Sequence, residues 1–90
     1  MKITFSGTSW EQYLHWQDAD AKITARINDL IRDASRNPFG ELGKPEPLPN
    51  ELSGWWSRRI TDEHRFVYRV AGKGSEQALE IAAYRFHCAR

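Results

Sequence analysis

Residues 52–70 read LSGWWSRRITDEHRFVYRV and contain two β-rich runs. The runs Trp55–Ile60 and His64–Val70 are separated by a polar segment short enough to turn a β-hairpin. Because side chains alternate between the two faces of a strand, the second run separates an apolar row from a row that carries two arginines. The stretch therefore predicts a hairpin with one face on the core and the other face exposed.

Four arginines lie in this hairpin. Arg65 and Arg69 share one face of the second run, whereas Arg58 and Arg59 are adjacent and point to opposite faces in any register. Guanidinium groups beside two tryptophans are typical of a surface that binds a polyanion. The alternative is that these arginines only solvate an exposed sheet face and protect its edge from pairing.

The composition suggests one small domain. The chain has 90 residues, of which 40% are hydrophobic, and we expect a single domain over residues 1–90. The single cysteine, Cys88, excludes an intramolecular disulfide and suits a reducing cytoplasm, where we expect the protein. No apolar run approaches the roughly 20 residues of a membrane span, so no membrane partner is expected. The net charge of +1 is not that of a strongly basic nucleic-acid binder.

The residues before the hairpin predict a strand and two helices. Lys2–Ser6 alternates as a short half-buried strand. Thr8 or Ser9 can cap a first helix, which ends by about Asp18–Asp20, and Asp20 can cap a second one. Asn37-Pro38 ends the second helix, because proline disfavours helical geometry in the residue before it. The second helix has the clearest apolar face, formed by Ile23, Ile27, Leu30, Ile31 and Ala34.

The residues after the hairpin predict a last strand over Gln77–His87. Simple alternation puts Leu79, Ile81, Ala83, Arg85 and His87 on one face, and Ala78, Glu80, Ala82, Tyr84 and Phe86 on the other. The order of elements indicates an α+β fold, with two helices on one side of an antiparallel sheet of about four strands.

Residues 38–53 contain all four prolines and are too long for an ordinary turn. Proline fixes φ, so we expect a structured loop that holds Lys44 and Glu46 in place. The alternative is a disordered linker, although no second domain follows for it to connect.

Glu46, Arg65 and His87 are the candidates for chemistry. Cleavage of a phosphodiester by an internal 2′-hydroxyl needs a base, a cation that stabilises the phosphate, and an acid for the leaving oxygen. A carboxylate, a guanidinium and an imidazole can supply these three roles. Each residue could instead be structural, with His87 a terminal surface histidine and Glu46 a solvated loop charge. No Cys/His pair has ligand spacing, so no metal or other cofactor is expected. A nucleophilic Cys88 beside His87 is a weaker possibility.

Several segments resemble the Txe/YoeB family of bacterial toxins, within the RelE-like superfamily. They are KPEPL at 44–48, LSGWWSRRITDEHRFVYRV at 52–70, YRFH at 84–87, SWEQYLHWQ at 9–17 and NPFG at 37–40. The resemblance covers nearly the whole chain. It implies two helices against a twisted antiparallel sheet, and a ribosome-dependent mRNA endonuclease that inhibits translation.

The resemblance also assigns roles to individual residues. It implies that Glu46 is the general base, Arg65 binds the phosphate and His87 is the general acid, with no metal required. It places RNA contacts at Lys44 and Arg59. We add the neighbouring aromatic and basic residues to the expected RNA-binding set, which comprises Trp55, Arg58, Arg69, Phe86 and Cys88. Relatives carry tyrosine at the position of Cys88 and often lysine at that of Pro49, so base stacking and one phosphate contact differ here.

The resemblance further implies partners. We expect a partly disordered cognate antitoxin of the YefM/Axe type, the ribosome with its mRNA, operator DNA bound only through the antitoxin complex, and a possible homodimer. Exposed aromatics such as Trp10, Trp16 and Phe39 could anchor a partner chain. Two alternatives to a ribosome-dependent enzyme are a degenerate toxin that only binds antitoxin or DNA, and a ribonuclease that cleaves another RNA without the ribosome.

Overall fold

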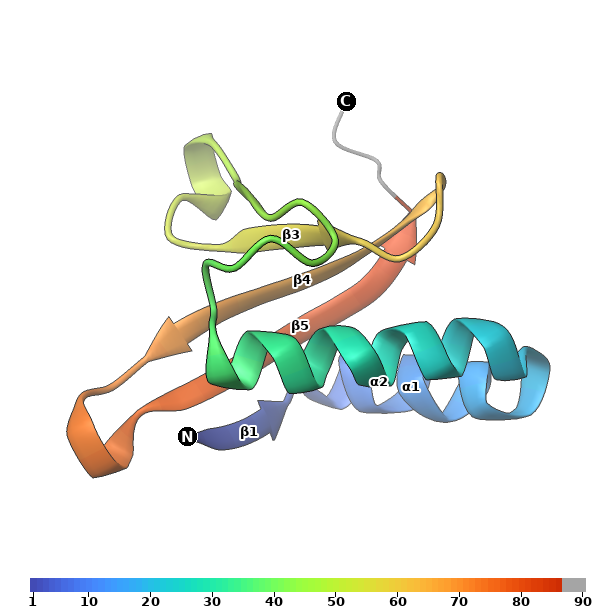
Figure 1. Ribbon diagram of the computed structural model, residues 1–90, viewed down its shortest axis with the longest axis horizontal. Helices are drawn as coiled ribbons and strands as arrows, with labels where there is room; N and C mark the ends of the chain where they lie inside the picture. Colours follow the sequence, from blue (N-terminus) through green and yellow to red (C-terminus); the bar gives the residue numbers. More distant parts are fainter. Residues whose placement is uncertain (87–90) are drawn as a thin grey trace.

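Two helices pack on one face of a five-stranded sheet (Figure 1). The computed structural model describes residues 1–86 and, for residues 85 and 86, the backbone. The strands are β1 (Lys2–Phe5), β2 (Glu46–Pro47), β3 (Trp56–Arg59), β4 (His64–Ala71) and β5 (Ala78–Phe86). The helices are α1 (Gly7–Ala19) and α2 (Ala21–Arg36), and short 3-10 turns span Asn50–Leu52 and Gly74–Glu76. The predicted α+β class, with the helices on one side, is confirmed.

The strand order is β1-β5-β4-β3-β2, so the sheet has five strands rather than about four. It is also mixed rather than wholly antiparallel, because β1 runs parallel to β5. The amide of Lys2 donates to the carbonyl of Gln77 and that of Ser6 to Ile81, both at 3.0 Å. The extra strand is β2, whose two residues form the far edge, where the missing N–H of Pro47 is tolerated.

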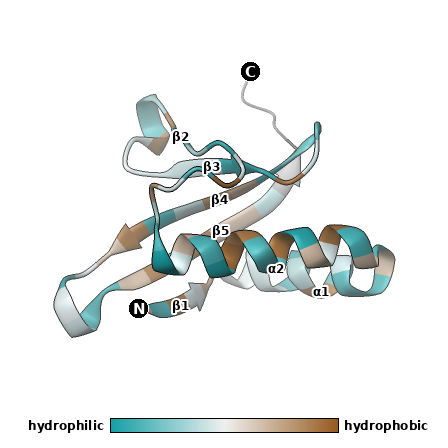
Figure 2. Cartoon of the chain, in the orientation of Figure 1, coloured by the Kyte–Doolittle hydropathy of each residue, from teal (hydrophilic) through white to brown (hydrophobic). Residues whose placement is uncertain are grey.

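The helix caps follow local hydrogen bonding. The N-cap of helix α1 is Ser6, two or three residues before the predicted Thr8 or Ser9, and the Ser6 side chain accepts from the Ser9 amide at 3.0 Å. Ser9 is instead buried, and its hydroxyl donates to the Ile81 carbonyl at 2.9 Å. Asp20 caps α2 as predicted, accepting from the amides of Lys22 and Ile23. Figure 2 shows hydrophobic and hydrophilic bands alternating along α2, as expected of an amphipathic helix.

The core lies between α2 and the sheet. Ile27 and Leu30 of α2 are fully buried against the β4 residues Phe66 and Tyr68. The ring of Phe66 stacks on that of Tyr68 at 4.9 Å and on that of Tyr84 at 5.7 Å between centroids. The sequence correctly placed Phe66 and Tyr68 on the covered face of the hairpin.

A β-bulge in β5 changes the predicted faces of that strand. Val67 pairs with Ala83 and Tyr68 with Ile81, so Ala82 is an extra residue. Simple alternation placed Tyr84 on the face opposite Ile81, and that prediction was wrong. One inserted residue reverses the alternation, so Tyr84 faces the core and is only 1% exposed. The prediction for His87 falls outside the described residues.

Candidate active site on the open face of the sheet

Within residues 1–86, no helix covers the second face of the sheet, which we name the open face (Figure 1). Direct cross-strand partners share a face, so the strand register identifies its side chains. They are Glu46 from β2, Ser57 and Arg59 from β3, Arg65, Val67 and Arg69 from β4, and Glu80 and Ala83 from β5. The open face therefore gathers charged residues that lie far apart in the sequence.

Glu46 and Arg65 form an ion pair at one end of the open face. The Nη1 atom of Arg65 donates to Oε1 of Glu46 at 3.1 Å. Glu46 lies opposite Ser57 and Arg65 lies opposite Arg59, so the pair crosses β3 diagonally. The side chain of Arg65 is 13% exposed and that of Glu46 is 62% exposed. The structure thus brings together two of the three residues predicted to carry chemistry, with the carboxylate accessible to solvent.

Arg59 adds a second guanidinium beside this pair. It lies directly opposite Arg65 across the β3–β4 ladder, and its side chain is exposed. Like charges at directly opposed positions are unfavourable, and an anion between them relieves that repulsion. The arrangement is therefore suited to binding a phosphate.

The loop before β2 is fixed against this end of β3. The amide of Arg59 donates to the carbonyl of Gly43 at 2.8 Å. Gly43 has φ of +77°, and a Cβ there would lie 2.8 Å from a methyl carbon of Leu30, so glycine is required. The next residue, Lys44, is exposed and also has positive φ, at 53°. The predicted structured loop is confirmed at these positions, and it carries Lys44 two residues before Glu46.

Arg58 does not belong to the open face. Its side chain is fully buried on the helix side, where Nη1 lies 2.6 Å from Oδ2 of Asp33. Its Nε donates to the Tyr68 hydroxyl at 3.0 Å. The remaining bonds from its guanidinium go to the carbonyl oxygens of Asn37, Pro38 and Leu42. The RNA contact predicted for Arg58 is incompatible with this burial, because its donors are already engaged in the core.

Trp55 and Arg69 lie toward the other end of the open face. The guanidinium carbon of Arg69 is 4.6 Å from the centroid of the Trp55 ring, a cation–π contact. Nε of Arg69 also donates to Oε1 of Glu80 at 2.7 Å. The predicted RNA-binding residues Trp55 and Arg69 therefore lie on the same face as Glu46 and Arg65. His87, Cys88 and the side chain of Phe86 lie outside the described residues.

Sequence reasoning missed two residues of this face. Ser57 is 2% exposed, lies opposite Glu46, and its hydroxyl has no hydrogen-bond partner within the described chain. Glu80 pairs with Arg69, a contact that depends on the register of β4 and β5. Because Trp55, Ser57 and Arg59 alternate along the strand, the sequence could have placed Ser57 on the same face as Arg59.

In residues 1–86 there is no group of three or more His, Cys, Asp or Glu residues that could hold a metal ion.

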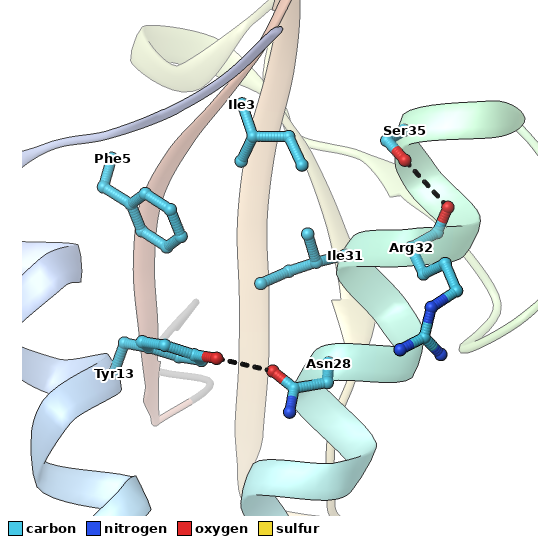
Figure 3. A pocket seen from close by; sticks show the side chains of 7 residues that line it. All are labelled: Ile3, Phe5, Tyr13, Asn28, Ile31, Arg32 and Ser35. Carbon is cyan, nitrogen blue, oxygen red and sulfur yellow. Dashed lines mark hydrogen bonds between the residues drawn. The ribbon is translucent and has the colours of Figure 1, made fainter. Parts of the chain in front are cut away.

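A pocket lies on the helix side of the sheet, between β1 and the two helices (Figure 3). It has a volume of about 370 Å³ and is lined by Ile3, Phe5, Tyr13, Asn28, Ile31, Arg32 and Ser35. The Tyr13 hydroxyl donates to Oδ1 of Asn28 at 2.7 Å and so links α1 to α2. None of the predicted site residues lines this pocket, so the open face remains the candidate active site.

No helix in the described part of the chain is long and apolar enough to cross a membrane.

Comparison with known proteins identifies the class. A family model described as "YoeB-like toxin of bacterial type II toxin-antitoxin system" matches residues 5–88. Toxin YoeB of Escherichia coli K12 is 53% identical over 87 residues, which cover 97% of this chain and 99% of that protein. With this match, the fold defines a bacterial toxin of the type II toxin–antitoxin class. The chain belongs to the YoeB-like family within that class, which confirms the resemblance of its motifs.

Solved structures agree with this assignment. A YoeB/ParE toxin from Agrobacterium tumefaciens superposes with a TM-score of 0.92 at 56% identity, covering 97% of this chain and 99% of that one. YoeB from Staphylococcus aureus, solved as a dimer and in a heterotetrameric YoeB–YefM toxin–antitoxin complex, gives TM-scores of 0.85 and 0.84. Both are 39% identical to this chain, and each match covers 97% of both chains.

Proposed function

We propose that this protein is an endoribonuclease that cleaves mRNA in the ribosomal A site and thereby inhibits translation. The observation that carries the proposal is the Glu46–Arg65 pair at 3.1 Å on the open face, with Arg59 opposite Arg65. A carboxylate next to a pair of guanidinium groups provides a proton acceptor beside a phosphate-binding site. Membership of the YoeB-like toxin family supports a toxic activity of the chain.

In the proposed reaction, phosphate oxygens replace the Glu46 carboxylate on the guanidinium of Arg65. The released carboxylate takes the proton of the 2′-hydroxyl, and the 2′-oxygen attacks phosphorus. Arg65 stabilises the charge that develops on the phosphate, as a preorganised cation does in such transition states. The bond from phosphorus to the 5′-oxygen breaks, and His87 donates a proton to that oxygen. The products are a 2′,3′-cyclic phosphate and a 5′-hydroxyl.

The small net charge supports dependence on the ribosome. Free proteins that bind nucleic acid through many phosphate contacts need several uncompensated cations. This chain has a formal net charge of +1, and Arg65 and Arg69 already have carboxylate partners. A ribosome that holds the codon in place supplies positioning that the enzyme alone lacks.

The decisive experiment is cleavage of a defined mRNA on stalled ribosomes, with primer extension and analysis of the product ends. We expect cuts in the A-site codon that leave a 2′,3′-cyclic phosphate. Glu46→Gln, Arg65→Ala and His87→Ala should each slow cleavage by about 100-fold or more, as removal of a general acid or base or of an oxyanion donor does elsewhere.

Matched controls separate chemistry from folding. Glu11→Gln, Arg32→Ala and His15→Ala change exposed residues of the same types on the two helices, on the other side of the sheet from the open face, and they should cut at the wild-type rate. Folded Arg65 and His87 variants that still cut at the wild-type rate would show that the roles are wrongly assigned. If folded wild-type protein makes no cuts, the chain is instead a binding module without catalysis.

The partners follow from the relatives. We propose a YefM-like antitoxin for this chain, because a 39% identical YoeB is known in a heterotetrameric complex with YefM. A homodimer is also proposed, since the same relative was solved as a dimer. Trp10 is 45% exposed, Leu14 41% and Ile3 43%, which leaves apolar surface on α1 and β1 for such contacts.

A further inference from the structure

A small pocket lies on the open face, apart from the Glu46–Arg65 pair. It has a volume of about 160 Å³. Its lining comes from β1 and the residue after it, from β5 and from the residue before β3, and consists of Thr4, Phe5, Ser6, Trp55, Glu80, Ile81 and Ala82. The lining is mostly apolar, and Glu80 is its one charged side chain. The other polar side chains in the lining are the hydroxyls of Thr4 and Ser6, and the Ser6 hydroxyl already donates to the carbonyl of Ala82 at 3.2 Å. An aromatic ring beside a carboxylate makes a pocket that is suited to a flat ligand with hydrogen-bond donors.

The β5 bulge helps to shape this pocket. Ala82 is the inserted residue, and its side chain is a single methyl group, so it takes little space from the pocket that it lines. Trp55 is held in place by Arg69, whose guanidinium carbon lies 4.6 Å from the indole centroid. Glu80 is held by the same residue, through the 2.7 Å bond from Nε of Arg69. Arg69 therefore fixes both the ring and the carboxylate that face the pocket.

The pocket and the candidate active site lie along one strand. Arg65 and Arg69 are four residues apart on the same face of β4, which corresponds to about 13 Å at the rise of a β-strand. Ser57, Val67 and Ala83 form the floor between them and carry no charge. A single strand of RNA whose phosphate lies at Arg65 can follow this floor and bring a flanking base to Trp55.

The chemistry of Glu80 selects among bases. An ionised carboxylate only accepts hydrogen bonds. Adenine, cytosine and guanine each present an exocyclic amine as a donor, and glutamate accepts well from the amine of cytosine. Uracil presents a carbonyl oxygen at the corresponding position, which the carboxylate repels. Stacking on an aromatic ring accepts any base, so Trp55 supplies affinity and Glu80 supplies the preference.

We propose that the pocket formed by Trp55, Glu80 and Ala82 is a nucleobase subsite. It takes an RNA base that carries an exocyclic amine, stacked on Trp55 and hydrogen-bonded to Glu80. The assignment rests on the proposed function, for which this base flanks the phosphate that is cut.

Cytidine and uridine are suitable probes, because they differ at the amine and have no phosphate to bind at Arg65. Each nucleoside is titrated into the ¹⁵N-labelled protein, and the indole N–H signals are followed by NMR. The Trp55 signal is the one missing from Trp55→Phe. We expect cytidine to shift this signal with an affinity at least threefold higher than that of uridine. Glu80→Gln should abolish the preference, since an amide both donates and accepts, whereas Glu76→Gln in the exposed turn should retain it.

Trp55→Ala should weaken binding of cytidine and uridine alike by about tenfold, within the range known for base stacking and followed through the backbone amides of β5. The proposal is overturned if neither nucleoside shifts the Trp55 signal. It is also overturned if the wild type binds cytidine and uridine with equal affinity, as Glu80→Gln is expected to do. These measurements need no cleavage. If the protein binds cytidine but makes no cuts, the subsite is supported and the nuclease function is rejected. If the protein cuts mRNA but does not bind cytidine, only the subsite is rejected.

Discussion

Arg58 and Arg59 are neighbours in β3, yet they lie in opposite environments. The guanidinium of Arg58 is fully buried on the helix side, paired with Asp33 and bonded to backbone carbonyls. Arg59 is exposed on the open face, opposite Arg65. The two residues have the same chemistry, and only the alternation of the strand separates them. A count of arginines in a hairpin therefore overestimates the charge available to RNA, because part of it stabilises the fold.

The sharpest test of this contrast is a pair of single substitutions. Arg58→Met should lower the free energy of unfolding by about 3 kcal/mol, because it leaves Asp33 and three loop carbonyls without their partner. Arg59→Met should change it by about 0.5 kcal/mol or less, as exposed substitutions usually do. Urea unfolding monitored by tryptophan fluorescence measures both. Equal losses in the two variants would contradict the assignment of Arg58 to the core and Arg59 to the surface.

Tyrosines on the helix-covered face of the sheet should also determine how the free energy of unfolding changes at alkaline pH. Burial raises the pKa of Tyr84 far above its ordinary value of about 10, with a smaller contribution from Tyr13. Burial also raises the pKa of Tyr68, opposed by its hydrogen bond from Arg58. The folded protein keeps these protons while the unfolded chain loses them above pH 10. The stability from each tyrosine is therefore complete below that pH and is lost as the pH rises further.

Tyr84→Phe isolates this effect. Above pH 10 the wild-type free energy of unfolding should fall by up to about 1.4 kcal/mol per pH unit for each such tyrosine. In the variant, the contribution of Tyr84 to that slope should be absent. At neutral pH its free energy of unfolding should be close to that of the wild type, since the Tyr84 hydroxyl has no hydrogen-bond partner within residues 1–86. Denaturation curves of the wild type and the variant between pH 8 and about pH 11 give the two slopes. Identical slopes in wild type and Tyr84→Phe would refute this explanation.

A small effect on stability is also expected from breaking the ion pair of the candidate active site. Glu46→Gln breaks an ion pair whose carboxylate is 62% exposed, so it should change the free energy of unfolding by less than about 1 kcal/mol. The same variant should lose most of its cleavage activity. Thermal unfolding and the ribosome assay, performed on one preparation, measure the two quantities together. A large loss of stability would mean that Glu46 is mainly a structural residue and would weaken its assignment as the base.

The sequence predicted local features well. The hairpin turn, the Asp20 cap and the apolar face of α2 depend on residues close in the chain, and the structure has all three. Alternation also separated Arg58 from Arg59, although it could not decide which of them the helices would cover. That choice depends on the packing of the second helix against Phe66 and Tyr68, which is a property of the whole fold.

Features that depend on pairing between distant segments were not predictable in the same way. The contact between Glu46 and Arg65 follows from the register of β2, β3 and β4. Residue chemistry grouped these two residues and the motif resemblance supported the group, but neither one gives the pairing that brings the side chains together. The bulge at Ala82 has no signal in the alternation of β5, since an inserted alanine looks like any other small residue. Parallel pairing of β1 with β5 likewise depends on the path of the chain through both helices.

The bulge at Ala82 has a consequence for how this protein can change in length. Deleting Ala82 would restore a uniform alternation in which Ile81 and Tyr84 still face the core and Ala83 still faces the open side, so the core register of β5 does not depend on the inserted residue. The same insertion also forms a wall of the small pocket on the open face. Loss of Ala82 would therefore change the wall of this pocket while the core-facing residues of β5 keep their register.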